Sequence, residues 1–323
     1  MITAIAGGVG GARMLRALTT AVPPAEITAV VNTGDDVVMH GLAISPDLDT
    51  VTYTLAGAIN AETGWGLAGE SWQAMHELRT LSGGRLGWFA LGDRDLGTHL
   101  YRTSRLLEGA TLTEATAEVA RRWDVGLRLL PMSDDRVETR VRLAGPHGEP
   151  ADEVGFQEYF VGRGHDVPIA AVRYAGVEQA RPAPGVLDAI AAAEAVVCCP
   201  SNPILSIGPV LAVPGVFDAL RARREQVVAV SPIIAGHALK GPADRVLREL
   251  GHEATAAGVA RIWSAWVGTL VVDEADAALA DAVEGAGVRC VVAPTIMSGP
   301  EESAALARTV LGAAGLHPEA TRP

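Results

Sequence analysis

The chain of 323 residues is poor in aromatic residues, which make up only 4% of it, although hydrophobic residues make up 49%. Its core must therefore consist mostly of Ala, Val, Leu and Ile, a composition typical of parallel sheets covered by helices. This favours an α/β protein over a β-sandwich, and the length suffices for one large α/β domain.

Positive charge is also scarce, because 26 Lys and Arg residues against 38 Asp and Glu residues leave a formal net charge of −12. A partner bound through the phosphate backbone of DNA or RNA requires a basic surface, so no nucleic-acid partner is expected. A small anionic ligand is still compatible with this charge, since an arginine or a helix N-terminus can hold a phosphate inside an acidic protein.

A basic leader, a long apolar run and a cysteine framework are absent as well. No segment reaches the length needed to cross a bilayer. Cys198, Cys199 and Cys290 fit neither a disulfide pattern nor a zinc-ligand spacing, and are interpreted as small core residues in a reducing compartment. The sequence therefore predicts a cytoplasmic protein with no membrane partner.

The order of the apolar runs predicts a Rossmann-like fold with a mostly parallel sheet flanked by helices. Residues 2–6 and 27–31 flank a glycine loop and a helical stretch, as in a βαβ unit. Further strands are expected at residues 195–200, 227–232, 269–276 and 288–294. A polar loop follows each of them, at the edge where open α/β folds bind ligands.

The middle of the chain departs from this rhythm. Thr111 and Glu114 stand at capping-box spacing and predict a helix. Residues 136–144 alternate polar and apolar side chains, and "GPHGEP" supplies a turn, so an antiparallel hairpin with one solvated face is expected. We therefore expect a single α/β domain over residues 1–323 with a smaller inserted α+β region at about 110–175.

The glycine loop "AGGVGGAR" is the first candidate for a binding site. Gly8, Gly10 and Gly11 would let backbone amides approach a phosphate, although a tight turn without a ligand explains them too. No P-loop lysine follows, and Arg13 replaces the third glycine of a dinucleotide fingerprint. Asp35, after the second strand, could bind a ribose hydroxyl or belong to a polar turn.

Asp47 and Asp49 in "SPDLDT" are the second candidate. Asp49 or the adjacent Thr50 could be the N-cap of a helix through "VTYTLAGAI", but capping does not account for both aspartates. Two carboxylates at this spacing on a loop can share a hard cation or accept hydrogen bonds from the hydroxyls of a ligand.

Two further groups of polar residues follow. Asp93, Arg94, Asp95 and His99 gather at the start of an expected helix, either as a solvated ion-pair cluster or as a site in which Arg94 binds phosphate. Hydroxyl and amide groups also follow the later strands, in turns that suit ribose or phosphate oxygens: Ser201, Asn202, Ser206 and Ser231.

In order along the chain, "GGVGGAR", "VVNTGDD", "HGLAISPDLDTVTYTLAG", "LGDRDLGTHL", "LLPMSDDRVET", "PSNPILSIGPVLAVPG" and "VAVSPII" closely resemble the 2-phospho-L-lactate transferase family of coenzyme F(420) biosynthesis. The resemblance implies transfer of a 2-phospholactyl or phosphoenolpyruvyl group from a guanosine diphosphate derivative to the ribityl hydroxyl of 7,8-didemethyl-8-hydroxy-5-deazariboflavin, with release of GMP. It also implies Mg²⁺ dependence and a homodimer. The composition favours the actinobacterial, enolpyruvyl type.

Carried onto this chain, the resemblance gives each group of residues a role. The chemistry of such a transfer makes Asp49 and Arg94 the catalytic candidates, with Arg94 neutralising phosphate charge, and Asp47 with Asp49 the candidates for contact with the metal or the hydroxyl. The deazaflavin would contact Asp49, Asp93, Arg94 and His99, and the guanosine diphosphate would contact Gly8, Gly10, Gly11, Ser201, Asn202, Ser206 and Ser231. Asp49→Asn should then lower turnover or deazaflavin binding far more than stability.

Two other functions compete with this one. A nucleotide-sugar-binding regulator of the gluconeogenesis-factor type shares the glycine loop but would neither bind nor convert deazaflavin. The hypothesis of a nicotinamide dehydrogenase depends on Gly8, Gly10 and Asp35, and Arg13 in place of the third glycine argues against it.

Overall fold

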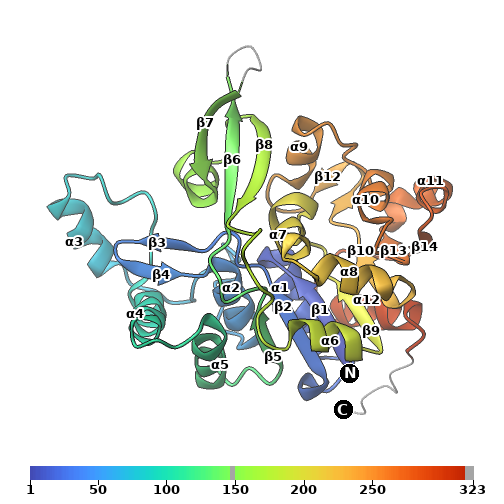
Figure 1. Ribbon diagram of the computed structural model, residues 1–323, viewed down its shortest axis with the longest axis horizontal. Helices are drawn as coiled ribbons and strands as arrows, with labels where there is room; N and C mark the ends of the chain where they lie inside the picture. Colours follow the sequence, from blue (N-terminus) through green and yellow to red (C-terminus); the bar gives the residue numbers. More distant parts are fainter. Residues whose placement is uncertain (146–149, 317–323) are drawn as a thin grey trace.

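The protein is built on a central parallel sheet with helices on both faces (Figure 1). A computed structural model describes residues 1–145 and 150–316. Over these residues the sheet has seven strands in the order β14-β13-β10-β9-β1-β2-β5. They are β1 (Ile2–Ala6), β2 (Ile27–Val31), β5 (Arg128–Pro131), β9 (Ala195–Cys198), β10 (Val227–Val230), β13 (Thr269–Val272) and β14 (Arg289–Val292). The predicted fold class and the six strands predicted for this sheet are confirmed.

The strand order reverses beside β1. The chain adds β2 and then β5 on one side of β1, and later returns to place β9 on the other side. Loops that leave two neighbouring strands in opposite directions open a crevice at their carboxyl ends, which is where open α/β sheets bind ligands. Here those connections are residues 199–206 after β9 and the glycine loop after β1, which consists of Gly7 and the first helical turn that follows it, residues 8–11.

Two cores fill the two faces of the sheet. Because side chains alternate along a strand, Ile5 joins one core while Ala4 and Ala6 join the other. One core is covered by α1 (Gly8–Leu18), α2 (Pro46–Leu55), α5 (Leu112–Arg122) and α12 (Pro300–Ala313). The other is covered by α6 (Val186–Ala192), α7 (Gly208–Ala212), α8 (Val216–Ala222), α9 (Ala243–Glu249), α10 (Ala256–Trp263) and α11 (Ala280–Gly285).

Three small antiparallel sheets are attached to this body. β6 (Glu138–Ala144) pairs with β7 (Pro150–Gly155) as the predicted hairpin and also with β8 (Ile169–Ala175), so the sheet has the order β7-β6-β8. It stands at the top of Figure 1. Most of the predicted turn, residues 146–149, lies outside the described residues. Strand β5, inside the region predicted as an insertion, forms an edge of the central sheet.

The other two small sheets are hairpins that follow the carboxyl ends of strands in the central sheet. β3 (Val37–Met39) pairs with β4 (Leu42–Ile44) directly after β2, and β11 (Ile233–Ile234) pairs with β12 (His237–Ala238) after β10. Helices α3 (Gln73–Leu81) and α4 (Asp93–Leu107) follow the first hairpin, and a small apolar cluster of Ile44, Met75 and Leu91 joins them to it.

Local sequence signals explain two helix starts. Thr111 and Glu114 form the predicted capping box at the start of α5. Helix α2, however, begins at Pro46 with Ser45 as N-cap residue, so the prediction of Asp49 or Thr50 as N-cap was wrong. Proline is favourable at the first helical position, and both aspartates lie in the first turn, where the helix dipole favours negative charge.

Among the described residues, no single helix combines the length and apolarity required to cross a membrane. One bent pair, Pro203–Ala212 with Val216–Ala222 at 95° to each other, meets the requirement by length and composition when the two are taken together.

Candidate active site

The glycine loop and the loop after β9 meet at the switch point. The Ser201 hydroxyl lies 2.7 Å from the Gly7 carbonyl oxygen, to which it donates, and 3.3 Å from the Gly7 amide nitrogen. A Cβ atom at Gly10 would lie 2.2 Å from the carbonyl oxygen of Pro200, so only glycine allows this approach. Ser206 also lies against this segment, since a Cβ atom at Gly7 would lie 2.8 Å from its Cβ atom.

Two of the predicted nucleotide-binding residues make local contacts instead. The side-chain oxygen of Asn202 accepts hydrogen bonds from the amides of Ile204 and Leu205 and thereby caps the helical turn that follows. Ser231 donates its hydroxyl to the carbonyl oxygen of Ile233 at 2.8 Å. Both lie at the carboxyl edge of the sheet, but the structure brings only Ser201 and Ser206 against the glycine loop.

Asp47 faces the glycine loop as part of a buried acidic cluster. The Asn32 side chain, at the end of β2, donates to Asp47 Oδ2 at 2.9 Å and to Asp35 Oδ1 at 3.2 Å. Burial raises the pKa of Asp47 to about 6, although hydrogen bonds from Asn32 and the Gly8 backbone oppose this shift. Burial, with the charges of Asp47 and Asp36, raises the pKa of Asp35 well above its ordinary value.

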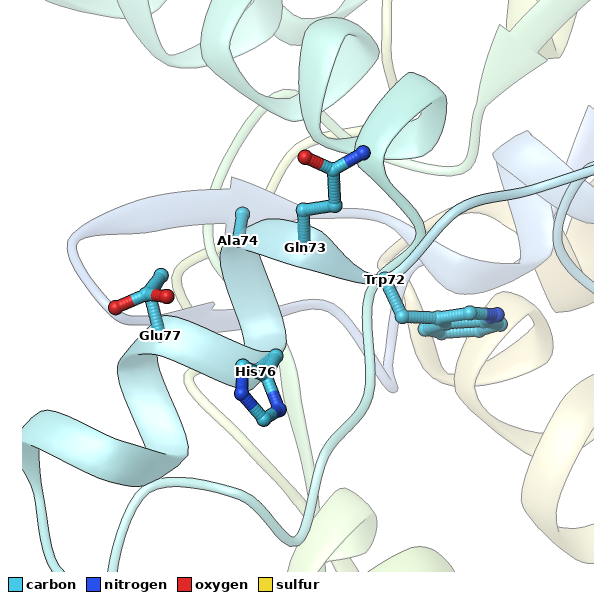
Figure 2. A pocket seen from close by; sticks show the side chains of 5 residues that line it. All are labelled: Trp72, Gln73, Ala74, His76 and Glu77. Atoms are coloured by element: carbon cyan, nitrogen blue, oxygen red, sulfur yellow. The ribbon is translucent and has the colours of Figure 1, made fainter.

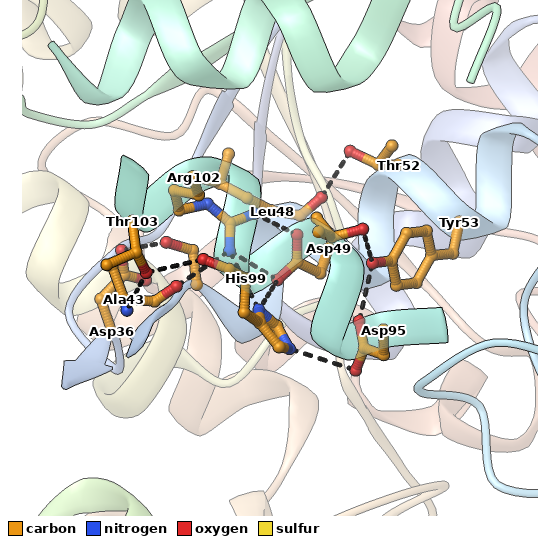
Figure 3. A network of polar contacts seen from close by, with 12 residues as sticks. Asp36, Ala43, Leu48, Asp49, Thr52, Tyr53, Asp95, His99, Arg102 and Thr103 are labelled. Carbon is orange, nitrogen blue, oxygen red and sulfur yellow. Dashed lines mark hydrogen bonds and ion pairs between the residues drawn. The ribbon is translucent and has the colours of Figure 1, made fainter. Parts of the chain in front are cut away.

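Asp49 points away from Asp47 and into a second buried network. Residues two apart on a helix lie on different faces, so the first turn of α2 sends the two carboxylates to different partners. Arg102 of α4 donates to Asp49 Oδ2 at 3.1 Å and also contacts Asp49 Oδ1 (Figure 3). Burial opposes the charge of Arg102, yet Asp49 raises the pKa of the guanidinium above its ordinary value.

His99 and Asp95 extend this network along α4. His99 Nδ1 lies 3.7 Å from Asp49 Oδ2, and His99 Nε2 lies 3.3 Å from Asp95 Oδ2. The hydroxyl of Tyr53, one turn after Asp49 on α2, lies 2.7 Å from Asp95 Oδ1. Burial favours a raised pKa for Asp95, but the hydrogen bond and charge of His99, with Tyr53, outweigh it and lower the pKa.

Asp93 and Arg94 face the other side of α4. The Asp93 carboxylate accepts hydrogen bonds from Ser71 Oγ at 2.6 Å and from the Gln73 and Ala74 amides at 3.0 Å, and so caps α3. Arg94 is exposed and donates to the Ala68 carbonyl oxygen at 2.9 Å. Of the predicted deazaflavin-binding residues, the structure thus brings Asp49 and His99 together and places Asp93 and Arg94 beside the 68–74 segment.

A shallow hollow lies near that segment, on the first half of α3. It is lined by Trp72, Gln73, Ala74, His76 and Glu77 (Figure 2). The Trp72 indole projects away from the helix axis and is 50% exposed. No hydrogen bond of the described residues joins these lining side chains to the Asp47 or Asp49 clusters.

Two clusters could hold a metal ion, and they differ in chemistry. Asp49, Asp95 and His99 offer three ligand atoms within 4.8 Å of one another, but Arg102 already pairs with both Asp49 oxygens. Asp35 and Asp47 offer only oxygen, beside the Asn32 amide, and no ion pair is recorded for either within residues 1–145 and 150–316. Mg²⁺ prefers oxygen ligands, so the second cluster fits it better.

Sequence reasoning did not single out Asn32, Tyr53 or Arg102. Helical spacing was the available signal: Tyr53 follows Asp49 by four residues, and Arg102 follows His99 by three. That spacing places each pair on one face of a helix, but it does not reveal that the two faces meet.

These observations define a doubly wound α/β protein with its candidate site at the topological switch point. The chain belongs to the 2-phospho-L-lactate transferase CofD family, whose model matches residues 2–291. It is 48% identical over 311 residues to a phosphoenolpyruvate transferase of Streptomyces griseus, covering 96% of this chain and 97% of that protein. It is 48% identical over 315 residues to the phosphoenolpyruvate transferase of Kitasatospora aureofaciens, covering 97% of each protein. It is 43% identical over 324 residues to the phosphoenolpyruvate transferase of Mycolicibacterium smegmatis, covering 98% of this chain and 99% of that protein.

The fold is also shared with a solved structure of lower sequence similarity. A member of the UPF0052 family from Bacillus halodurans superposes with a TM-score of 0.62 at 17% identity, over 96% of this chain and 98% of that one. This likeness confirms the fold alone. The family membership makes the chain a transferase of coenzyme F(420) biosynthesis, and the regulator is not favoured.

Proposed function

We propose that the protein transfers a phosphoenolpyruvyl group from enolpyruvyl-diphospho-guanosine to the ribityl hydroxyl of 7,8-didemethyl-8-hydroxy-5-deazariboflavin. The hydroxyl oxygen forms a bond to the β-phosphorus, the anhydride bond to the α-phosphate breaks, and the hydroxyl proton is lost. The products are GMP and dehydro coenzyme F(420)-0. The observation that carries this proposal is near-full-length similarity to proteins named phosphoenolpyruvate transferase, and the same names favour the enolpyruvyl donor over the lactyl donor.

We place the guanosine diphosphate at the glycine loop. Gly8, Gly10 and Gly11 lie in the first turn of α1, where a helix leaves backbone amides without intrahelical partners, and Ser201 and Ser206 lie against Gly11 and Gly7. Backbone amides and hydroxyls are suitable donors to phosphate oxygens. Asn202 and Ser231, at the same edge, would contact the nucleotide only if it displaced their present local hydrogen bonds.

The Mg²⁺ expected for this family fits Asp47 and Asp35. Their carboxylates are buried and share the Asn32 amide, and Asp47 lies beside the glycine loop. Burial raises the pKa of both, and the charges of Asp47 and Asp36 add to the shift of Asp35, so a cation there would stabilise the ionised carboxylates. When bound, Mg²⁺ would neutralise charge on the diphosphate. This assignment keeps Asp47 as a ligand and replaces Asp49 with Asp35, because Asp49 pairs with Arg102.

Asp49 is proposed to position the deazaflavin hydroxyl. Arg102 donates to the carboxylate and holds it in a fixed orientation. Asp49 is therefore assigned to orient the acceptor. His99 supports it from within the network, while Asp93 and Arg94 stay candidates for the outer part of the deazaflavin site, with Arg94 able to bind phosphate charge.

The experiment that tests the donor compares enolpyruvyl-diphospho-guanosine with lactyl-diphospho-guanosine, each with deazaflavin and Mg²⁺. We expect a higher kcat/KM with the enolpyruvyl compound and a product mass two hydrogens below that of the lactyl product. A preference for the lactyl donor would contradict the proposed donor but not the transfer reaction. The homodimer and the cytoplasmic location remain predictions, and sedimentation of the purified protein tests the first.

A further inference from the structure

Lys240 is the only lysine of the chain, and its side chain reaches a loop that is distant from it in the sequence. It follows the β11-β12 hairpin, yet its ammonium group donates to the carbonyl oxygen of Thr63, in the loop between α2 and α3. The same ammonium lies 5.2 Å from the ring centroid of Trp65, which is 56% exposed. Its partners among the described residues are thus a carbonyl oxygen and an aromatic face, neither of which carries a formal charge.

The loop that Lys240 meets is a compact strap, residues 59–67. An antiparallel bridge between Ile59 and Leu67 closes its ends, and the Gly64 amide donates to the Asn60 carbonyl oxygen at 2.8 Å. A Cβ atom at Gly64 would lie 2.5 Å from Lys240 Nζ and 3.2 Å from Val9 Cγ1. Gly64 also has a φ of 80°, so the tip of the strap rests between Lys240 and the glycine loop.

A second cation, Arg13, lies on the face of α1 that carries Val9. Arg13 follows Val9 by four residues, which is one helical turn, and its guanidinium donates to the Met297 carbonyl oxygen. Burial and the charge of Arg13 together lower the pKa of Lys240. Like charges that approach each other without a counter-ion favour the arrival of an anion between them.

Neighbouring arginines differ from this pair. Arg248 on α9, for example, lies 2.9 Å from Asp244, and Arg245 lies 3.2 Å from Glu249. In a chain with a net charge of −12, carboxylates are plentiful, yet neither Arg13 nor Lys240 has an ion pair among the described residues. Arg13 and Lys240 therefore lie beside the glycine loop without an acidic partner among the described residues, unlike the two arginines of α9.

We propose that Lys240 and Arg13 form the cationic wall of the nucleotide site and bind the diphosphate of the donor over the glycine loop. This inference rests on the proposed function and adds two phosphate-binding residues to it. The loop after β12 and the strap then enclose the diphosphate opposite the Asn32, Asp35 and Asp47 cluster. Arg13 occupies the position where a dinucleotide fingerprint has its third glycine.

The single lysine allows a direct test, because reductive methylation of the native protein modifies only Lys240 and the N-terminal amine. Mass spectrometry measures the methylation rate of both amines under three conditions: without ligand, with guanosine and with GDP. We expect GDP, and not guanosine, to slow methylation of Lys240 at least about tenfold, as a charge-assisted bond to phosphate would. The N-terminal amine, paired with Glu194, is the internal control and should react equally in all three.

Kinetics of variants provide the second measurement. Lys240→Met should raise KM for the guanosine diphosphate donor about 10- to 100-fold and leave KM for deazaflavin unchanged, while Lys240→Arg should recover most of the loss. Arg248→Met, which removes an ion-paired cation nearby, should change neither KM. A purely structural tether to Thr63 would instead affect both substrates alike.

The outcomes separate this inference from the proposed function. If the wild-type protein binds no GDP and releases no GMP, both fail. If it binds GDP and turns over, but Lys240 is methylated at an unchanged rate and Lys240→Met keeps its donor KM, only the phosphate role of Lys240 is overturned.

Discussion

Breaking the buried pair between Arg102 and Asp49 at one partner should strongly destabilise the protein. The two side chains are 2% and 7% exposed, so Arg102→Met, similar in length but uncharged, would leave Asp49 as a buried carboxylate without its cation. Breaking a buried ion pair by removing one partner costs about 3–5 kcal/mol. That is a large share of the roughly 5–15 kcal/mol that stabilises a folded protein.

Urea unfolding of the two proteins, followed by circular dichroism and tryptophan fluorescence, measures this loss. The matched control is Arg261→Met, which breaks the exposed pair with Glu253 and should cost less than about 1 kcal/mol. The double variant Asp49→Asn with Arg102→Met should lose less than the two single losses combined, because neither charge is then stranded. A loss below about 1 kcal/mol for Arg102→Met would refute the reasoning.

Two more predictions concern the glycine loop and its acidic neighbour. Because burial raises the pKa of Asp47 from 3.8 to about 6, the folded state binds the proton more tightly than the unfolded state, and stability falls as pH rises from about 4 to 7. Without Mg²⁺, Asp47→Asn should therefore raise the free energy of unfolding at pH 7 by up to about 3 kcal/mol and weaken the dependence of this free energy on pH. Turnover should be lost. If the pH profile of urea unfolding were the same in the variant and the wild type, the raised pKa of Asp47 would not be the cause of the pH dependence. Gly10→Ala should destabilise by about 1–3 kcal/mol and abolish GDP binding in calorimetry, because its Cβ atom would overlap the Pro200 carbonyl oxygen. Gly97→Ala, on the open face of α4, is the control and should be neutral or stabilising.

The framework of the fold could be predicted from the sequence because its signals are local. Apolar runs of four or five residues, each followed by a polar loop, mark the buried parallel strands, and the capping box of Thr111 and Glu114 marks a helix start. Strand β5 was not predicted, since "RLLP" is short and carries no alternation. The third strand of the small sheet, β8, was missed because its pairing with β6 is set by contacts far apart in the sequence.

The site could be predicted only in part, because residue types can be read from a sequence but their partners cannot. Asp47 and Asp49 were singled out together, yet the helix begins at Pro46 and turns them to different neighbours. Pairing with Arg102 also changes the expectation for Asp49→Asn, which should now cost stability as well as turnover. Only the packing of α4 on α2 creates this pair, and no spacing within one segment encodes it.

The most direct test of the proposed function is a discontinuous assay of GMP. Purified protein is incubated with Mg²⁺ and enolpyruvyl-diphospho-guanosine, with and without 7,8-didemethyl-8-hydroxy-5-deazariboflavin. We predict that GMP is released only when the deazaflavin is present, in equal amount to a phosphodiester-linked deazaflavin product. A folded protein that releases no GMP with either the enolpyruvyl or the lactyl donor, or that releases it without forming this product, would contradict the assignment.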